Sequence, residues 1–152
     1  MIDASALATI GGSLALIAGL VGSAIGIATA ASGGVATLSE DPRQFRNVLI
    51  LASLPMTQSF YGLIMLILVL TAVLPVEGTE GSVALGVSLI AAFAFVVSAI
   101  YQGTVCASGI AMLPKTGGKI LTSSMMLAVF VELIAVLALV FSIMAFTLLG
   151  LM

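Results

Sequence analysis

The sequence has no histidine, no tryptophan and one cysteine, and only 7% of its 152 residues are charged. A soluble domain carries about 25% charged residues, so this chain cannot cover a surface that faces water. Without histidine or clustered cysteine, zinc and copper sites are excluded. The lone cysteine, Cys106, also excludes a disulfide within the chain. We therefore predict an integral membrane protein whose ligands are oxygen atoms.

Four long stretches of the chain contain no charged residue, with one exception in the last. They cover residues 4–39, 47–76, 81–114 and 120–152. Each exceeds the length of about 20 residues that crosses the hydrocarbon core of a bilayer. We predict an all-α membrane protein with a single membrane domain, 1–152, embedded in the lipid bilayer. Its transmembrane helices are expected at residues 5–37, 47–74, 82–112 and 120–149.

The positive charges indicate how the helices are oriented. All four lie in two predicted loops, 39–46 and 113–119, at positions Arg43, Arg46, Lys115 and Lys119. Lysine and arginine are enriched in short cytoplasmic loops. We expect a multi-pass protein of the cell membrane with both of these loops in the cytoplasm and both termini outside.

The chain contains an internal repeat. Residues 21–38 align without gaps with residues 96–113, and the match includes the run Val-x-Ser-Ala-Ile. Such self-similarity predicts two units of the same architecture. We predict two tandem helical hairpins, 5–74 and 82–149. Both start on the outer side of the membrane, so the hairpins are parallel.

Glu132 is the charged residue that interrupts the last apolar stretch, at the middle of its predicted helix. A charged side chain at the centre of a bilayer costs about 2.5–3.5 kcal/mol on insertion scales. Such residues generally belong to an ion pathway, a proton relay or a ligand counter-ion. Gln58 takes the corresponding place in the first hairpin, with a one-residue shift. We therefore expect one ion-carrying carboxylate per chain.

A face of small residues follows the first predicted helix. Glycine recurs every seven residues at Gly12, Gly19, Gly26 and Gly33, and Gly22 lies in an intervening turn. Small residues let helix backbones approach closely in a membrane. This pattern favours a helix in the inner wall of a ring of copies, and the alternative is tight packing within one four-helix bundle.

Polar side chains share one face of the second predicted helix. Leu54, Thr57, Gln58 and Tyr61 are spaced i, i+3, i+4 and i+7, which places them on the same side. Lipid cannot satisfy such groups, so they must face protein or a bound ion. Pro55 removes one helical N–H, which predicts a local kink and carbonyl groups that are free to bind a cation.

Two further polar residues, Gln102 and Glu132, lie at the same depth as Gln58. Each of the three is about 12–13 residues from a basic residue of its loop, or about 18–20 Å along a helix. We favour a shared site, and interhelical hydrogen bonds without an ion are the alternative. One carboxylate balances one monovalent cation. The additional oxygens favour Na⁺ over H⁺, because a proton needs only the carboxylate.

The segment L-P-x-T-Q-x-x-Y at residues 54–61, the two parallel glycine-rich hairpins and Glu132 resemble the proteolipid (subunit K) of V-type ATPases. The sequence looks most like the bacterial sodium-translocating form. The resemblance implies a homo-oligomeric rotor ring that turns against a stator membrane subunit and meets a central-stalk subunit at the cytoplasmic loops. It also implies that the chain is not itself a catalyst. The implied Na⁺ ligands are Glu132, Gln102, Gln58, Thr57 and the backbone carbonyl of Leu54, with Tyr61 bonded to Glu132.

Two alternatives remain open from the sequence. The same architecture can carry H⁺ in place of Na⁺. A small multidrug/proton antiporter also has four helices and one membrane glutamate, but there the glutamate typically lies in the first helix, among aromatic residues that include tryptophan. We expect no nucleic-acid partner.

Overall fold

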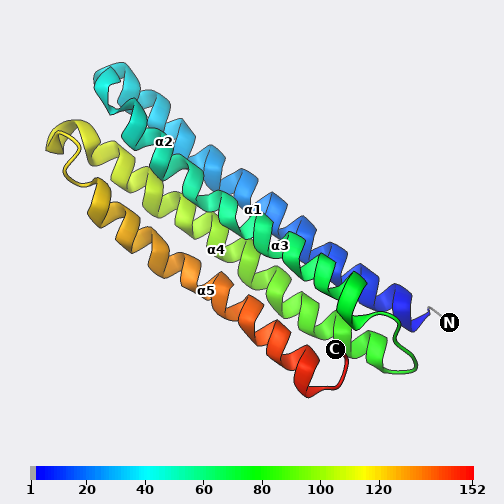
Figure 1. Ribbon diagram of the computed structural model, residues 1–152. Coiled ribbons are helices and arrows are strands. Elements are labelled where there is room, and N and C mark those ends of the chain that lie inside the picture. Colours follow the sequence, from blue (N-terminus) through cyan, green and yellow to red (C-terminus); the bar gives the residue numbers. More distant parts are fainter. Residues whose placement is uncertain (1–2) are drawn as a thin grey trace.

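The computed structural model describes residues 3–152, which form four long helical spans (Figure 1). All four are long and apolar enough to cross a membrane, and no strand occurs within residues 3–152. These features confirm the predicted all-α membrane fold. Three of the spans are single helices, α1 (Ala4–Glu40), α4 (Glu80–Thr116) and α5 (Leu121–Leu148).

The second span is one helical segment, Pro42–Val73, whose winding changes along its length. It contains two α-helical parts, with a tighter 3₁₀ turn before each of them and a wider π-helical turn at the end. In chain order the parts are the 3₁₀ turn Pro42–Gln44, α2 (Phe45–Ser53), the 3₁₀ turn Leu54–Met56, α3 (Thr57–Leu68) and the π-helical turn Val69–Val73.

The first three spans are longer than predicted, so the predicted loops 39–46 and 113–119 are too long, and α5 is one residue shorter than predicted at each end. α1 continues to Glu40, and Asp41 alone separates it from the next helical turn. α4 passes Pro114 and ends where Gly117 adopts a left-handed conformation, with φ 59°. A helix of 37 residues is about 55 Å long, whereas the hydrocarbon core is about 30 Å thick. Charged residues in helical turns beyond the core reach water without a loop.

Hydrogen bonds to Asp41 close the connection between α1 and the second span. Its carboxylate accepts from Arg43 Nε at 2.9 Å and from Gln44 Nε2 at 3.1 Å. These bonds to the ionised form hold the pKa of Asp41 below its usual range. Gln44 also accepts from Asn47, and a Cβ added to Gly118 would lie 2.8 Å from Asn47 Nδ2. The connection that carries Arg43 and Arg46 therefore lies beside the one that carries Lys115 and Lys119. These two basic turns are at the end of the bundle opposite the chain termini (Figure 1).

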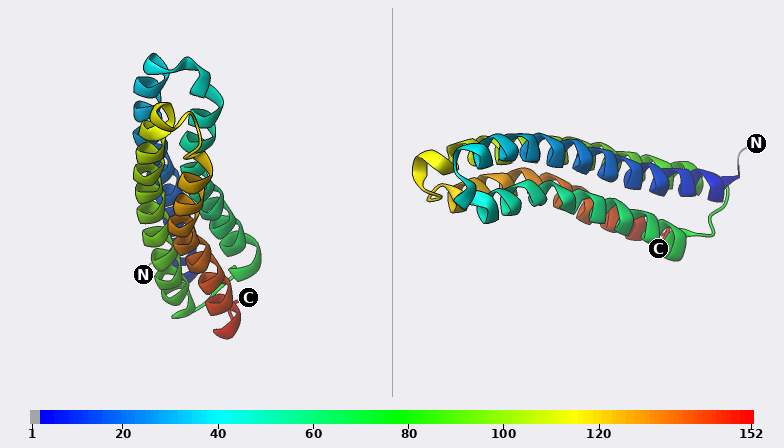
Figure 2. Two further views of the ribbon diagram at one scale, coloured as in Figure 1. Left: turned by 90° about the vertical axis from the view of Figure 1, so that its left-hand side faces the viewer. Right: turned by 90° about the horizontal axis from the view of Figure 1, so that it is seen from above.

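The four spans form two layers. α1 and α4 pack against each other in one layer, and the second span and α5 form the other (Figure 2, right). α1 contacts the second span, and α4 contacts α5. In this arrangement the first hairpin consists of α1 with the second span, and the second hairpin consists of α4 with α5.

The small face of α1 packs inside the chain. Gly19 lies against the backbone carbonyl of Gln58, and Gly26 lies against the carbonyl of Ala99. An added Cβ at Gly22 would lie 2.7 Å from Val96 Cα in α4, and one at Gly12 would lie 3.2 Å from Leu66 Cδ1 in α3. Side chains at these four positions would therefore push α1 away from its neighbours.

Gly33 does not share this close packing. A Cβ added there would lie 3.8 Å from the nearest atom, in Ala107, whereas one at Gly34 would lie 2.5 Å from Val48 Cγ1. A straight α-helix drifts by about 20° per seven residues, so the contact face passes from Gly33 to its neighbour. Any role of the glycine face between copies of the chain stays a prediction.

Two apolar clusters fill the interior on either side of a polar level. One lies toward the chain termini and includes Met65, Phe95, Ala135 and Phe146. The other lies toward the basic turns and includes Leu51, Cys106, Ile110 and Ala128. Between them lie buried polar side chains, Gln58, Ser98 and Gln102.

Replacing Gly26 by alanine tests the close approach of α1 and α4. The new methyl group meets the Ala99 carbonyl and the Pro55 ring, so we expect a loss of about 1–3 kcal/mol in stability, as in other overpacked sites. The matched control is Gly33→Ala, which has space and gains helix propensity. Thermal unfolding in detergent, followed by circular dichroism, should show a lower Tm for Gly26→Ala alone. Equal Tm values for the two variants would contradict the packing.

Candidate cation site

Glu132 lies half-buried on α5, and both of its carboxylate oxygens accept a hydrogen bond. Tyr61 in α3 donates its hydroxyl to Oε1 at 2.7 Å. Gln102 in α4 donates Nε2 to Oε2 at 3.2 Å. Three spans thus meet at this carboxylate. An ionised carboxylate only accepts hydrogen bonds, so two donors are the partners that this form requires.

A chain of hydrogen bonds continues from Gln102 into the bundle. Gln58 donates Nε2 to Gln102 Oε1 at 2.9 Å and to Ser98 Oγ at 3.2 Å. Both glutamine side chains are fully buried. A buried polar group that loses its partner costs about 1–3 kcal/mol, so these bonds fix how the two amides are placed.

Three oxygen atoms lie close together at the far end of this series of hydrogen bonds, beyond Gln58. Thr57 Oγ1 lies 3.2 Å from the backbone oxygen of Leu54 and 3.2 Å from Gln58 Oε1. Each of these neighbours is an acceptor, but a hydroxyl carries only one hydrogen. One of the two close oxygen pairs therefore has no hydrogen between its atoms. A cation would satisfy all three oxygens at once.

Pro55 determines the backbone at this point. It has no N–H, so the carbonyl of Leu51 loses its usual α-helical donor, and the chain forms the 3₁₀ turn Leu54–Met56. Pro55 is buried against Gly26 of α1, because a glycine leaves room for its ring. This turn brings the Leu54 carbonyl next to the Thr57 hydroxyl.

The structure brings together all the residues predicted for the site, and it adds two that sequence reasoning missed. Ser98 joins the network through Gln58, as described above. Phe95 is fully buried and packs on the Tyr61 ring, with ring centroids 6.2 Å apart. Phe95 and Ser98 precede Gln102 by seven and four residues, which places both on the same face of α4 as Gln102. This spacing was the signal in the sequence that could have identified them.

The oxygen ligands that the site offers suit one monovalent cation. It offers one carboxylate, two amide oxygens, one hydroxyl and one backbone carbonyl, contributed by Glu132, Gln102, Gln58, Thr57 and Leu54. Within residues 3–152 there is no cluster of three or more His, Cys, Asp or Glu that could hold a metal ion. A divalent cation usually needs more anionic ligands than one.

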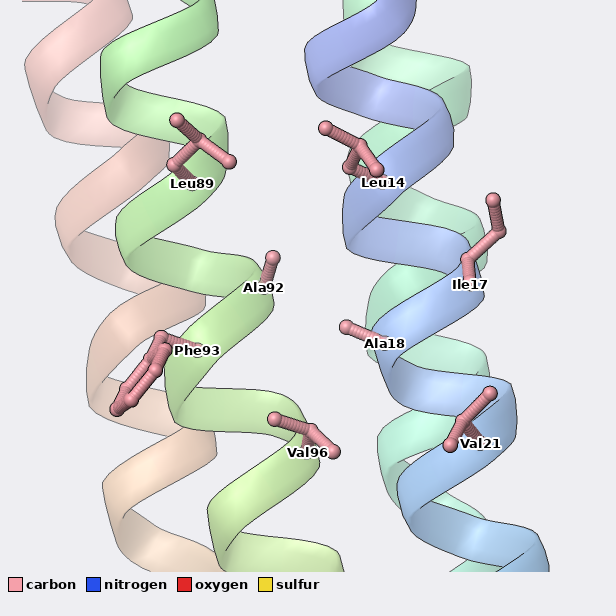
Figure 3. Close-up of a pocket in the computed structure, with 8 residues that line it drawn as sticks. All are labelled: Leu14, Ile17, Ala18, Val21, Leu89, Ala92, Phe93 and Val96. Carbon is pink, nitrogen blue, oxygen red and sulfur yellow. The ribbon is translucent and has the colours of Figure 1, made fainter.

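A groove on the α1–α4 layer has different chemistry. It has a volume of about 300 Å³, and all eight side chains that line it are apolar (Figure 3). Leu14 and Val21 of α1 face Leu89 and Val96 of α4 across it. The side chains of the groove offer no ligand to an ion, and the candidate cation site is the network around Glu132.

Comparisons with known proteins match most of the chain to one family. The chain matches the family model that describes the C subunit of ATP synthase over residues 10–69 and 85–145, one segment in each hairpin. It is 40% identical over 130 residues to the A-type ATP synthase subunit K of Methanocaldococcus jannaschii, and the match covers 80% of this chain and 59% of that protein. It is 35% identical over 127 residues to the V-type sodium ATPase subunit K of Enterococcus hirae, covering 80% of this chain and 78% of that protein.

These matches confirm the resemblance to V-type ATPase proteolipids and set aside the antiporter interpretation. The family model covers most of the chain, and the chain spans about three-fifths of the length of the Methanocaldococcus relative. The repeated hairpin that the sequence displays is thus that of a known family. The chain belongs to the family of ATP synthase C subunits.

Proposed function

We propose that this chain is the rotor subunit of a V- or A-type ATPase and that it carries Na⁺ across the membrane at Glu132. One observation carries the proposal: a half-buried membrane carboxylate that is linked through Gln102 and Gln58 to a cluster of neutral oxygens. The chain itself is not a catalyst. ATP hydrolysis or synthesis belongs to partner subunits, and the chain supplies the ion-carrying part.

The neutral oxygens favour Na⁺ over H⁺. A proton binds to the carboxylate alone, whereas Na⁺ must exchange its hydration shell for several oxygen ligands. The oxygens of Leu54, Thr57 and Gln58 lie close together with one hydrogen between them, an arrangement that a proton on Glu132 does not explain. The name of the Enterococcus relative, a sodium ATPase subunit, supports the same ion.

Charge neutralisation links ion binding to rotation. A loaded Glu132 site has no net charge and can face lipid, and its α5 neighbours Phe130 and Leu133 are exposed apolar side chains. An empty, anionic site is costly in hydrocarbon. It is tolerated beside a stator membrane subunit that offers positive charge and water. Moving one ion across 100 mV requires about 2.3 kcal/mol, so one ATP can drive several such steps.

The ring and its orientation follow from the same proposal. Copies of the chain form a closed ring in the bilayer, with α1 and α4 as the inner wall and the layer that carries Glu132 outside. The two adjacent basic turns face the cytoplasm, where a central-stalk subunit binds them, and both termini face outward. Because the first hairpin has Gln58 where the second has a carboxylate, each chain carries one ion.

Labelling of Glu132 by a fluorescent carbodiimide tests the choice of ion. The reagent attacks protonated carboxyl groups, and Na⁺ bound at the site displaces that proton. At fixed pH, membranes that contain the protein should lose labelling as Na⁺ rises into the millimolar range, and K⁺ at equal ionic strength should protect far less. Labelling that depends on pH and ignores Na⁺ would identify a proton carrier.

Replacing Glu132 by glutamine should abolish ion transport while the protein still inserts and assembles. Glutamine keeps the size of the side chain and removes the charge that balances the cation. The matched control is Glu77→Gln, which removes a carboxylate from the exposed connection before α4. ATP-driven ²²Na⁺ uptake into vesicles that contain the whole complex should vanish for Glu132→Gln and persist for the control. Uptake by Glu132→Gln above the background of inhibited vesicles would rule out Glu132 as the carrier.

A further inference from the structure

We propose that Ser98 is a positioning residue of the cation site and that it directs the oxygen of the Gln58 amide toward the bound Na⁺. This inference rests on the proposed function. It adds a residue on α4 that does not ligate the ion but determines which end of a buried amide the ion meets.

Ser98 lies between three spans at the level of the site. Its side chain is 2% exposed. Its hydroxyl donates to the backbone carbonyl of Val131 in α5 at 2.9 Å and accepts from Gln58 Nε2 at 3.2 Å. Val131 directly precedes Glu132, so the serine contacts the backbone that carries the carboxylate.

The direction of these two bonds is fixed by chemistry. The Val131 carbonyl has no hydrogen, so the serine must use its only hydrogen there. Toward Gln58 the serine then offers lone pairs, and it pairs with Nε2 but repels Oε1. The amide is planar, and its oxygen consequently points the other way, toward Thr57 Oγ1 at 3.2 Å.

The same orientation is passed on to Gln102. Gln58 Nε2 also donates to Gln102 Oε1, so Gln102 turns its own Nε2 toward Glu132. If the Gln58 amide rotated by 180°, its oxygen would face the oxygens of Ser98 and Gln102. In that orientation its nitrogen, a donor, would occupy the place where a cation needs an acceptor.

Removal of the Ser98 hydroxyl therefore weakens Na⁺ binding without removing a ligand. In Ser98→Ala the ionised Glu132 still holds Gln102 Nε2 toward itself, so Gln102 Oε1 is the one acceptor left to orient the Gln58 amide. The reversed Gln58 amide therefore becomes more populated in the empty site, and the ion must select the correct orientation. We expect the Na⁺ concentration for half-protection of Glu132 against carbodiimide to rise about threefold to tenfold. That change equals about 0.7–1.4 kcal/mol, the net size of one hydrogen bond.

A purely structural role for Ser98 predicts a different result. The serine also ties α4 to α5 through Val131, and loss of that tie alone would lower the Tm and leave the Na⁺ dependence unchanged. The positioning role shifts the Na⁺ half-protection, while the rate of Glu132 labelling in Na⁺-free buffer stays at the wild-type value. Tyr61 still holds the carboxyl group in the variant, as in the wild type.

Ser88→Ala is the matched control. Ser88 lies on the same helix and is fully buried, and among residues 3–152 its hydroxyl has no hydrogen-bond partner. It lies next to Gly11, outside the cation site. A second pair, Ser98→Thr and Ser98→Val, compares side chains of one shape with and without the hydroxyl. Ser98→Thr should bind Na⁺ more tightly than Ser98→Val, even if both lose stability.

The experiment is Na⁺ titration of carbodiimide labelling in membranes that contain the full-length chain, for the wild type and these variants. A raised half-protection concentration in Ser98→Ala and Ser98→Val, with Ser88→Ala at the wild-type value, supports the proposal. Wild-type values in Ser98→Ala, together with equal values for Ser98→Thr and Ser98→Val, overturn it and leave the Na⁺ function intact. A wild type that Na⁺ does not protect overturns both proposals.

Discussion

A carboxylate in the middle of a bilayer is stable only when its charge is compensated, and this requirement organises the structure around Glu132. The side chain is half-buried, at the surface of the bundle. Tyr61 and Gln102 supply hydrogen-bond donors to both oxygens. These donors lower the cost of the charge but do not cancel it. In the proposed function a cation completes the site, and this gives a physical reason for a loaded subunit to enter lipid and for an empty one to stay beside a stator.

The packing of α1 makes this arrangement possible. Glycines on its contact face let the backbone lie against Gln58, Pro55 and Ala99 without side chains between them. The second span and α4 can then hold their polar groups within hydrogen-bonding distance of each other. Apolar clusters above and below keep water away from the buried amides. The glycine pattern thus supports the site by allowing close packing, although glycine has no side chain that could bind an ion.

Much of this could be predicted from the sequence, because a bilayer leaves few choices. The four spans follow from long apolar runs, and the polar level follows from residues that lipid cannot satisfy. The helix ends could not be predicted, since charged residues such as Lys115 remain helical beyond the hydrocarbon. The shift of close packing from Gly33 to Gly34 depends on the accumulated drift of a long helix.

The hydrogen-bond partners of the buried polar residues also could not be predicted from the sequence. Serines are common in membrane helices, and the repeat pairs Ser98 with Ser23, so its sequence alone gave it no special place. Only the geometry shows that Ser98 bridges Gln58 and Val131 whereas Ser23, among residues 3–152, has no such partner.

The number of sodium ions held by each chain can be measured by equilibrium binding of ²²Na⁺ to the purified protein. We expect saturable binding of one Na⁺ per chain, competition by protons, and no saturable binding in Glu132→Gln. A ratio near two would mean that the first hairpin holds an ion of its own. The absence of saturable binding in the wild type would contradict the claim that Glu132 and its neighbouring oxygens form a sodium site.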